Sequence, residues 1–474
     1  MRTTTLHRPR AGRWPLATLA FAAAMATGPL AAVAQAPAAS TSPALNGTAP
    51  LSLNLSQAYR AALEQDAVIG AAEAAAAARR ERLPQARAQL LPNISANASR
   101  FRNDLESVQP GLNGQPFRSE QQYTSSSRAL TIRQPLYRPF NFADHQQAKA
   151  QVEDANATLD KEVQNVAVRV SGAYLEGLLA QDQLALVLAQ KEAYTTQLDA
   201  ARKRFAAGAG VRTDIDEAQA RVDMTIAQEL EARQNLDYTK RQLQVMVNAP
   251  IARLAPVDPE KLRATAPDPG ALLQWTDRAE QASPELRALR AQLEAARYEI
   301  EKAQAGHKPT LDAIAQWSIS DSDNVTRVNS RYDSKSIGVQ LNVPLFAGGY
   351  VNSQVRQAVA EQERIGQALE ATRRDLALRV EKEYRGLTEG ALRIRALEQA
   401  VKSTEIMVHS NRRSFEAGSR TLVDILNAEQ ERVSAMRDLA NARYVYMMSR
   451  IRLRALAGEA DEQAVQEINA WLAP

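Results

Sequence analysis

Two alternating runs decide the fold of this chain: Pro309-Thr-Leu-Asp-Ala-Ile-Ala-Gln-Trp-Ser-Ile-Ser320 and Ser336-Ile-Gly-Val-Gln-Leu-Asn-Val-Pro-Leu-Phe346. In each run an apolar side chain recurs at every second position, which is the period of a β-strand with one apolar and one polar face. Each run has about ten residues, the length of a strand tilted through a lipid bilayer. We therefore expect membrane strands over residues 309–321 and 334–346, joined by a loop at 321–333.

The N-terminal residues 1–34 have the features of a secretion signal. An apolar stretch ends in the small-residue cleavage site Ala32-Val33-Ala34, and a second such position follows Ala36. Four arginines precede the apolar stretch: Arg2, Arg8, Arg10 and Arg13. They account for the whole formal net charge of +4, so the mature chain is close to neutral and its charge gives no reason to expect nucleic acid as a partner. Residues 35–52, rich in Ala, Pro, Ser and Thr, predict a flexible lead-in.

The composition narrows the ways in which the chain can attach to a membrane. It contains no cysteine, which excludes disulfides, thiolate metal sites and a lipid-modified N-terminal cysteine. After the signal the sequence has no run of about 18 apolar residues, so we expect no spanning helix. A β-barrel is then the remaining way to cross a membrane.

The sequence between the signal and the C-terminus is duplicated. Phe205-Ala-Ala-Gly208 matches Phe415-Glu-Ala-Gly418 at an offset of about 210 residues, and further matches follow at the same offset. Each copy predicts a helix, two strands, a long helix, a glycine turn and a last helix. The predicted segments are a first repeat at 53–249, with strands at about 92–103 and 123–137, a Pro-rich linker at 250–271, a second repeat at 272–458 and a tail at 459–474. The predicted helices cover 54–91, 141–204, 213–248, 272–307, 350–415 and 422–457; the second would be about 95 Å long at roughly 1.5 Å per residue.

The architecture requires several chains. One long helix carries a seam in steps of four and three residues, which predicts a coiled-coil partner in the same chain or in another. The seam residues are Val351, Val355, Ala358, Gln362, Ile365, Leu369, Thr372 and Leu376. Four strands cannot close a barrel, and an open sheet edge cannot face lipid, so several chains must pool their strands around one axis. These residues do not fix the number of chains.

Over nearly all of the mature chain the sequence resembles the outer-membrane efflux protein (TolC) family. The resemblance rests on Arg87-Ala-Gln-Leu-Leu-Pro92, Pro344-Leu-Phe-Ala-Gly-Gly-Tyr-Val-Asn-Ser-Gln-Val355, Ala417-Gly-Ser-Arg-Thr-Leu-Val-Asp-Ile-Leu426 and Leu439-Ala-Asn-Ala-Arg-Tyr444. It implies a homotrimer in the outer membrane of a Gram-negative bacterium, with a 12-stranded β-barrel continued by an α-helical coiled-coil barrel through the periplasm. It also implies an equatorial belt formed by the linker and the tail, and exterior loops at 104–122 and 321–333.

The resemblance also implies the partners and the function. These are a periplasmic adaptor protein, an inner-membrane transporter of the RND, ABC or MFS class, and the outer-membrane lipid. The chain would passively export drugs, secreted polypeptides or both, as part of a tripartite pump or a type I secretion system, and would open at its periplasmic tip. The alternative is a secreted structural coiled coil without a pore, which explains the helices but not the paired alternating strands.

The turn around Gly418, with its counterpart at Gly208, is where the resemblance places the tip and its gate. Asp424 and Asn427 are three residues apart on one helix face and would form the constriction ring, whose carboxylates favour cations. The family usually has aspartate at both positions, so Asn427 predicts a weaker cation preference. The residues that resemble the gate contacts are Thr213, Asp214, Phe415 and Arg420. Because Phe415 stands where a tyrosine is common, we expect one closing bond to be lost and the gate to depend more on Arg420.

A simpler interpretation of two of these residues stays open. Thr421 and Asp424 have the spacing of a helix N-cap and its third residue, and so do Thr213 and Asp216. These pairs could serve only to start two helices. Both roles are compatible for Asp424.

The sequence predicts no catalytic, metal or cofactor site. The histidines are isolated at His7, His145, His307 and His409, without the spacing of a metal site. The chain has no cysteine and no nucleophile elbow. Gly348-Gly349 lacks the Lys-Ser/Thr that a phosphate-binding loop needs. We therefore expect the protein not to be an enzyme.

Overall fold

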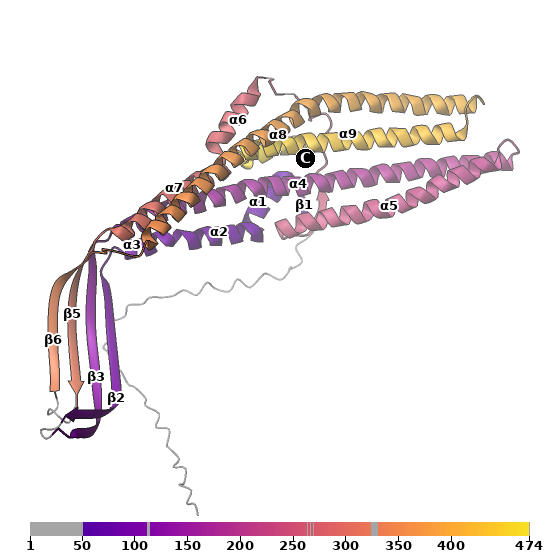
Figure 1. Cartoon of the computed structure of the whole chain (residues 1–474). Coiled ribbons are helices and arrows are strands. Elements are labelled where there is room, and N and C mark those ends of the chain that lie inside the picture. Colours follow the sequence, from indigo (N-terminus) through magenta and orange to yellow (C-terminus); the bar gives the residue numbers. More distant parts are fainter. Residues whose placement is uncertain are drawn as a thin grey trace, which may run out of the picture. The chain divides into compact units, whose positions relative to one another are not determined.

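The computed structural model describes residues 51–110, 114–262, 264–265, 267–268, 270–323 and 330–473. The predicted signal peptide and the lead-in up to residue 50 lie outside these residues. Figure 1 shows the described part as four strands in one sheet, followed by long helices and a few short elements. The signals for the long elements are local: alternating residues in the long strands, and helical stretches bounded mainly by Pro and Gly.

The four long strands form one antiparallel sheet in the order β2-β3-β5-β6. Their bounds are Asn93–Pro110, Pro116–Tyr137, Thr310–Ser322 and Ser330–Asn342. The register brings the alternating apolar residues into shared rows: Ile94 pairs with Ile132, Ile132 with Ala315 and Ala315 with Ile337. One face of the sheet is therefore apolar over several rows, while strands β2 and β6 form the two edges (Figure 1).

Two predicted loops are wrong in their bounds. Most of the expected loop at 104–122 is strand, since β2 has 18 residues and β3 has 22, and only residues 111–115 join them. Polar pairing extends this hairpin: Gln122 donates to Asp104 at 3.2 Å, and Asn103 donates to Ser125 at 2.9 Å. The second loop shortens to 323–329, of which 324–329 lie outside the described residues. Strand β6 ends at Asn342 rather than at 346, because Pro344 lacks the N–H that a ladder needs.

Two predicted continuous helices are divided. Residues 54–91 form α1 (Leu55–Gln65), α2 (Ala67–Arg80) and α3 (Arg82–Ala88). Asp66 ends the first of these and caps the second, accepting the Val68 N–H at 2.9 Å. Residues 272–307 form α6 (Ala271–Ala282), α7 (Pro284–Gln304) and the short 3₁₀ turn η1 (Ala305–His307). The break before α7 follows from Pro284, which cannot donate to the preceding turn.

Two long helical hairpins make up most of the remaining chain. They are α4 (Pro139–Ala206) with α5 (Arg212–Val247), and α8 (Tyr350–Glu416) with α9 (Leu422–Leu456). Helix α4 packs on both α5 and α9, which joins the hairpins side by side. Helix α8 also packs on α7, and all eight residues of the predicted seam are buried or half-buried. This chain therefore supplies a partner for α8.

Among the helices of the described residues, none is both long enough and apolar enough to cross a membrane.

The linker and the tail contain elements that the sequence analysis missed. Strand β4 (Ile251–Leu254) pairs in parallel with β1 (Leu51–Leu53), and α10 (Glu462–Asn469) packs on α1. The buried Tyr174 hydroxyl connects β1 to the residue that follows β4, donating to the Leu53 carbonyl at 3.0 Å and accepting the Ala255 N–H at 2.9 Å. These strands have only three and four residues, too few to show an alternating pattern.

Candidate functional site

The turns of the two helical hairpins have the same conformation. Gly208 and Gly418 have φ angles of 73° and 77°, the left-handed conformation that glycine adopts without strain. In each turn the N–H of the following residue reaches back five residues, from Ala209 to the Arg204 carbonyl at 3.0 Å and from Ser419 to the Ser414 carbonyl at 2.9 Å. This is the Schellman pattern of a helix C-terminus. Both repeats therefore reverse direction by the same backbone geometry.

Asp424 lies in a capping box at the start of α9. Its carboxylate accepts the Thr421 N–H at 2.9 Å, while the Thr421 hydroxyl accepts the Asp424 N–H at 3.3 Å. Arg420 lies 3.5 Å from the same carboxylate. The hydrogen bonds from Thr421, with help from Arg420, hold the pKa of Asp424 below its usual value. The capping interpretation is thus correct for Asp424, and the carboxylate remains charged and partly exposed.

The matching prediction for α5 is wrong. The N-cap of α5 is Val211, which has no side chain that can cap, so Thr213 already lies inside the helix. Asp216 instead accepts from the Arg212 Nε at 3.3 Å, one turn back along the same helix. The helix begins earlier because the Asp214 N–H donates a hydrogen bond to the Val211 carbonyl at 3.3 Å. Capping therefore explains nothing about Thr213 or its neighbour Asp214.

Asn427 is held by an arginine of the other hairpin. Arg221 of α5 donates from Nη2 to the Asn427 Oδ1 at 3.1 Å and from Nη1 to Gln430 at 2.7 Å. Its Nε lies 3.3 Å from Glu217. A neutral amide thus accepts a guanidinium N–H at the predicted constriction position. Sequence reasoning missed Arg221, because the residues it joins are more than 200 positions apart.

Phe415 also connects the two hairpins, through its ring. The guanidinium carbon of Arg204, at the end of α4, lies 4.3 Å from the centre of the Phe415 ring. A cation at this distance over an aromatic face is attracted by about 0.5–2 kcal/mol. The ring also packs on a buried cluster that both hairpins share: Tyr194, Leu198, Ala201, Ala218, Val222, Leu422, Ile425 and Leu426. Within the chain, Phe415 thus contacts the other hairpin through its stack on Arg204.

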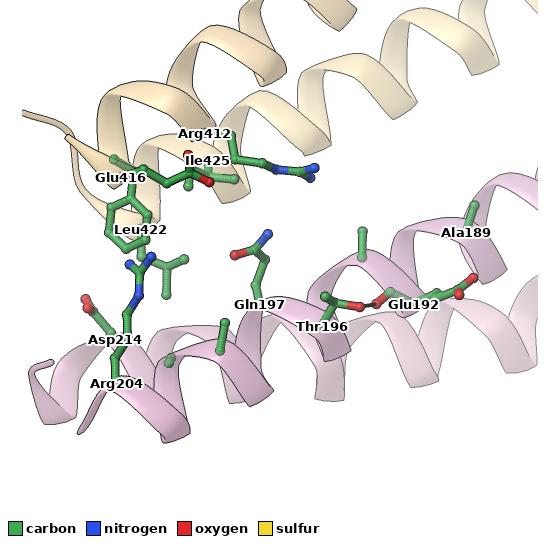
Figure 2. A pocket seen from close by; sticks show the side chains of 14 residues that line it. Ala189, Glu192, Thr196, Gln197, Arg204, Asp214, Arg412, Glu416, Leu422 and Ile425 are labelled. Atoms are coloured by element: carbon green, nitrogen blue, oxygen red, sulfur yellow. Dashed lines mark hydrogen bonds between the residues drawn. The ribbon is translucent and has the colours of Figure 1, made fainter. Parts of the chain in front are cut away.

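A cavity lies between the hairpins beside this stack. Figure 2 shows Arg204 and Asp214 on one side, with Arg412, Glu416 and Leu422 on the other. Among the described residues Arg420 does not pair with Asp214: its ion pair is with Asp424 of α9, the helix that begins two residues after it. The polar contacts of the described residues here are ion pairs and hydrogen bonds between helices, and no group of three His, Asp or Glu side chains among them could hold a metal ion.

The comparison with known families identifies the protein family of this chain. The family model described as outer membrane efflux protein matches residues 58–249 and 275–459 of the chain. The chain belongs to the outer membrane efflux protein family. The two matched segments fall on the two repeats, with the strands and hairpins inside them.

Relatives of known name agree with this membership. The chain is 36% identical to the alkaline protease secretion protein AprF of Pseudomonas aeruginosa over 420 residues, which cover 88% of this chain and 87% of AprF. It is 30% identical to the outer membrane protein TolC of Escherichia coli, covering 88% of this chain and 84% of TolC. This efflux family protein is therefore an outer-membrane channel protein of a Gram-negative bacterium, and the resemblance seen in the sequence is confirmed.

A solved channel structure shows the same fold. The CmeC outer membrane channel of Campylobacter jejuni superposes with a TM-score of 0.73 at 14% sequence identity, over 89% of this chain and 90% of CmeC. The predicted fold class, long helices with four strands per chain, is confirmed for this member of the efflux family. At this identity the likeness shows the fold alone.

Proposed function

We propose that three copies of this chain assemble into a 12-stranded β-barrel continued by a tube of helices. The sheet supports this proposal, because β2 and β6 are edge strands without a further partner among the described residues, while one face of the sheet is apolar. A closed barrel removes both edges from lipid. Helices α5 and α8 carry large apolar side chains that this chain leaves more than half exposed: Met224, Leu230, Tyr238, Val245, Leu378, Leu392 and Ile406. A neighbouring chain would cover them.

The duct opens and closes where the hairpins end. Asp424 of each chain contributes one charge to a ring at the constriction, and Asn427 lowers the preference for cations because Arg221 lies against its carbonyl. Thr213, Asp214, Phe415 and Arg420 form the gate contacts. Within each chain the hairpins are held together by Arg204 on Phe415 and by Arg221 on Asn427 and Gln430. Contacts of this size suffice in a trimer, since a shift from 1:99 to 99:1 needs only about 5.5 kcal/mol.

The named relatives support the cargo and the partners that we propose. AprF is named for protease secretion, so we propose secreted polypeptides as one cargo and drugs as the other. A periplasmic adaptor engages the ends of the hairpins, and an inner-membrane transporter of the RND, ABC or MFS class supplies the energy. The protein itself catalyses no reaction. The relatives give no support to the alternative of a structural coiled coil without a pore.

Pairing between chains can be tested directly because the chain has no cysteine of its own. We would place one cysteine on β2 and one on β6, starting with Asn97→Cys and Ser334→Cys, and move the β6 position along the strand to find the register. Oxidation of the detergent-extracted protein should give dimers and trimers on a denaturing gel. A set of β6 positions that yields only monomers would contradict the shared barrel.

The matched control uses a pair within the chain. Asn97 lies directly opposite Ala129 in the β2–β3 ladder, so cysteines at these two positions should join inside one chain and leave it monomeric on the gel. This control shows that oxidation is efficient and that the sheet has formed.

A further inference from the structure

The charged side chains of the long sheet lie almost entirely on its apolar face. Side chains of one face occupy every second position of a strand. The face that carries Ile94, Ile132 and Ala315 also carries eleven charged residues: Arg100, Arg102, Asp104, Glu106, Arg118, Glu120, Arg128, Asp321, Arg331, Asp333 and Lys335. Over the described strands the opposite face has Arg133 and Asp312, which bind each other at its helical end, and otherwise mainly Ser, Thr, Asn and Gln. Charges that served only an aqueous lumen would lie on that opposite face.

The charges begin where the apolar rows end. The register gives successive rows of this face as Ile94-Ile132-Ala315-Ile337, Ala96-Leu130-Trp317-Lys335, Ala98-Arg128-Ile319-Asp333 and Arg100-Ser126-Asp321-Arg331. On β5 the apolar part, from Leu311 to Ile319, spans roughly 27 Å along the strand, which at a tilt of about 40° covers about 20 Å of the roughly 25 Å apolar band of an outer-membrane barrel. The change to charge is on the hairpin side of this band, away from the helices (Figure 1). In the barrel proposed above, on which this inference rests, the change marks the outer boundary of the lipid.

Three arginines at this boundary have no acidic partner in the described part of the chain. Arg100 and Arg102 are successive residues of this face on β2, and Arg128 is the diagonal neighbour of Arg100 on β3, at a spacing that long side chains bridge. Among the described residues no carboxylate lies within ion-pair distance of any of the three, and all are exposed. The nearby acids have other partners: Asp321 with Arg331 at 3.8 Å, Asp333 with the Trp317 N–H at 2.8 Å, and Asp104 with Gln122 at 3.2 Å.

We propose that Arg100, Arg102 and Arg128 bind the phosphate groups of a lipid in the outer leaflet. Guanidinium groups pair with phosphate oxygens in a bidentate manner, and the apolar rows just below would contact the acyl chains of the same lipid. Lys335 over the Trp317 ring, at 5.8 Å, adds a fourth cation in the adjacent row. Counting from the row of Trp317 to Arg102, five basic side chains face two carboxylates, so the boundary is positively charged.

The test measures binding of lipid A that carries both phosphates to the detergent-purified full-length mature protein, by native mass spectrometry. Each basic residue near an anionic membrane surface contributes about fivefold in affinity, so the triple variant R100Q/R102Q/R128Q should bind roughly 100-fold more weakly. The single variant Arg128→Gln should lose about fivefold. Lipid A from which the phosphates have been removed should bind the wild-type protein no better than it binds the triple variant.

Arg118→Gln is the matched control for Arg128→Gln. Both arginines are exposed on the same face of β3, but Arg118 lies ten residues nearer the hairpin end and is 4.0 Å from Glu106. It should bind lipid A like the wild type. The triple lysine variant R100K/R102K/R128K keeps the charges and should keep most of the affinity. Each variant is also checked for unchanged single-channel conductance, which shows that the barrel has formed.

Several results would overturn the proposal. Equal losses in Arg118→Gln and Arg128→Gln would mean a general surface charge rather than a site. Undiminished binding of the phosphate-free lipid would show that the acyl chains alone decide binding. Displacement of the lipid by millimolar inorganic phosphate would indicate a site for free anions instead of a lipid headgroup.

Discussion

At the scale of single residues, Phe415 and Phe205 occupy the same position in the two repeats but have different surroundings. Phe415 packs on the shared core of the hairpins under Arg204, whereas Phe205 is 44% exposed. Phe415→Ala removes the stack and part of the apolar contact, which together stabilise the contact between the hairpins by about 1–2 kcal/mol per chain. We expect more frequent opening and a larger mean conductance in planar bilayers. Phe205→Ala is the matched control and should behave like the wild type; an equal rise in both variants would contradict this role of Phe415.

Asp424 leads to a prediction about pH. Hydrogen bonds from Thr421 hold its pKa below the usual 3.8, so the carboxylate keeps its charge to a lower pH than a free one. The contribution of its capping box to helix stability is therefore present above the ordinary pKa and is lost as the pH falls through the lower value of the folded protein. Cation preference, measured as a reversal potential in a salt gradient, should persist at pH 4 and then decline.

Two variants check that Asp424 is responsible. Asp424→Ala should show a reduced cation preference at neutral pH and no further decline in acid, where the wild-type carboxyl is neutral as well. Thr421→Ala removes the hydroxyl that donates to the carboxylate at 2.8 Å, so the decline should move to a higher pH. An unchanged pH profile in both variants would place the selective charge elsewhere.

At the scale of elements, the glycine turns decide where each hairpin reverses. Gly418 has a positive φ, and the space around its missing side chain is open, so a substitution there meets backbone strain and no clash. Gly418→Ala should destabilise the protein by about 1–2 kcal/mol. Gly366, inside α8, is also surrounded by open space but has a helical backbone, so Gly366→Ala should stabilise it by about 0.5–1 kcal/mol. Urea unfolding monitored by circular dichroism measures both, and the same sign for the two would contradict the turn geometry.

At the scale of the whole molecule, Asp312 connects the sheet to the helices. This residue of β5 is 2% exposed and accepts hydrogen bonds from Arg133 of β3 and from Arg138, the residue that precedes α4. The distances from its Oδ2 to the two guanidinium groups are 2.5 and 2.6 Å. One carboxylate therefore fixes the direction in which the first long helix leaves the strands.

Replacing this carboxylate should loosen the junction. Asp312→Asn leaves two guanidinium groups without a charged partner. It should lower the free energy of unfolding by about 2–3 kcal/mol. The loss would be larger for a fully buried pair, but both arginines are partly solvated. Asp321→Asn is the control on the same strand, because its pair with the exposed Arg331 is 3.8 Å long and should contribute less than about 0.5 kcal/mol. The temperature at which the assembled protein dissociates should fall only for Asp312→Asn. An equal fall in both variants would contradict the role of Asp312 in holding the sheet to the helices.

The sequence by itself determined the elements, because their signals are local. The alternation from Leu311 to Ile319, the Gly208 and Gly418 turns and the prolines that bound helices depend on neighbouring residues alone. The duplication and the family resemblance also came from the sequence, and so did Asp424 as the charged residue at the start of α9. Where local signals were weak, as at Asp66 and in the three-residue strand β1, the sequence reading failed.

Only the tertiary structure decided which distant residues meet. The contacts of Arg204 with Phe415, of Arg221 with Asn427 and of Asp312 with two arginines join positions about 170 or more residues apart. Their side chains carry no pattern that marks them among the 58 basic residues of the chain. The register of the sheet likewise placed Arg100 beside Arg128 and both above the apolar rows. Such contacts depend on how elements pack and pair, and the residue spacing within one element contains no information about that.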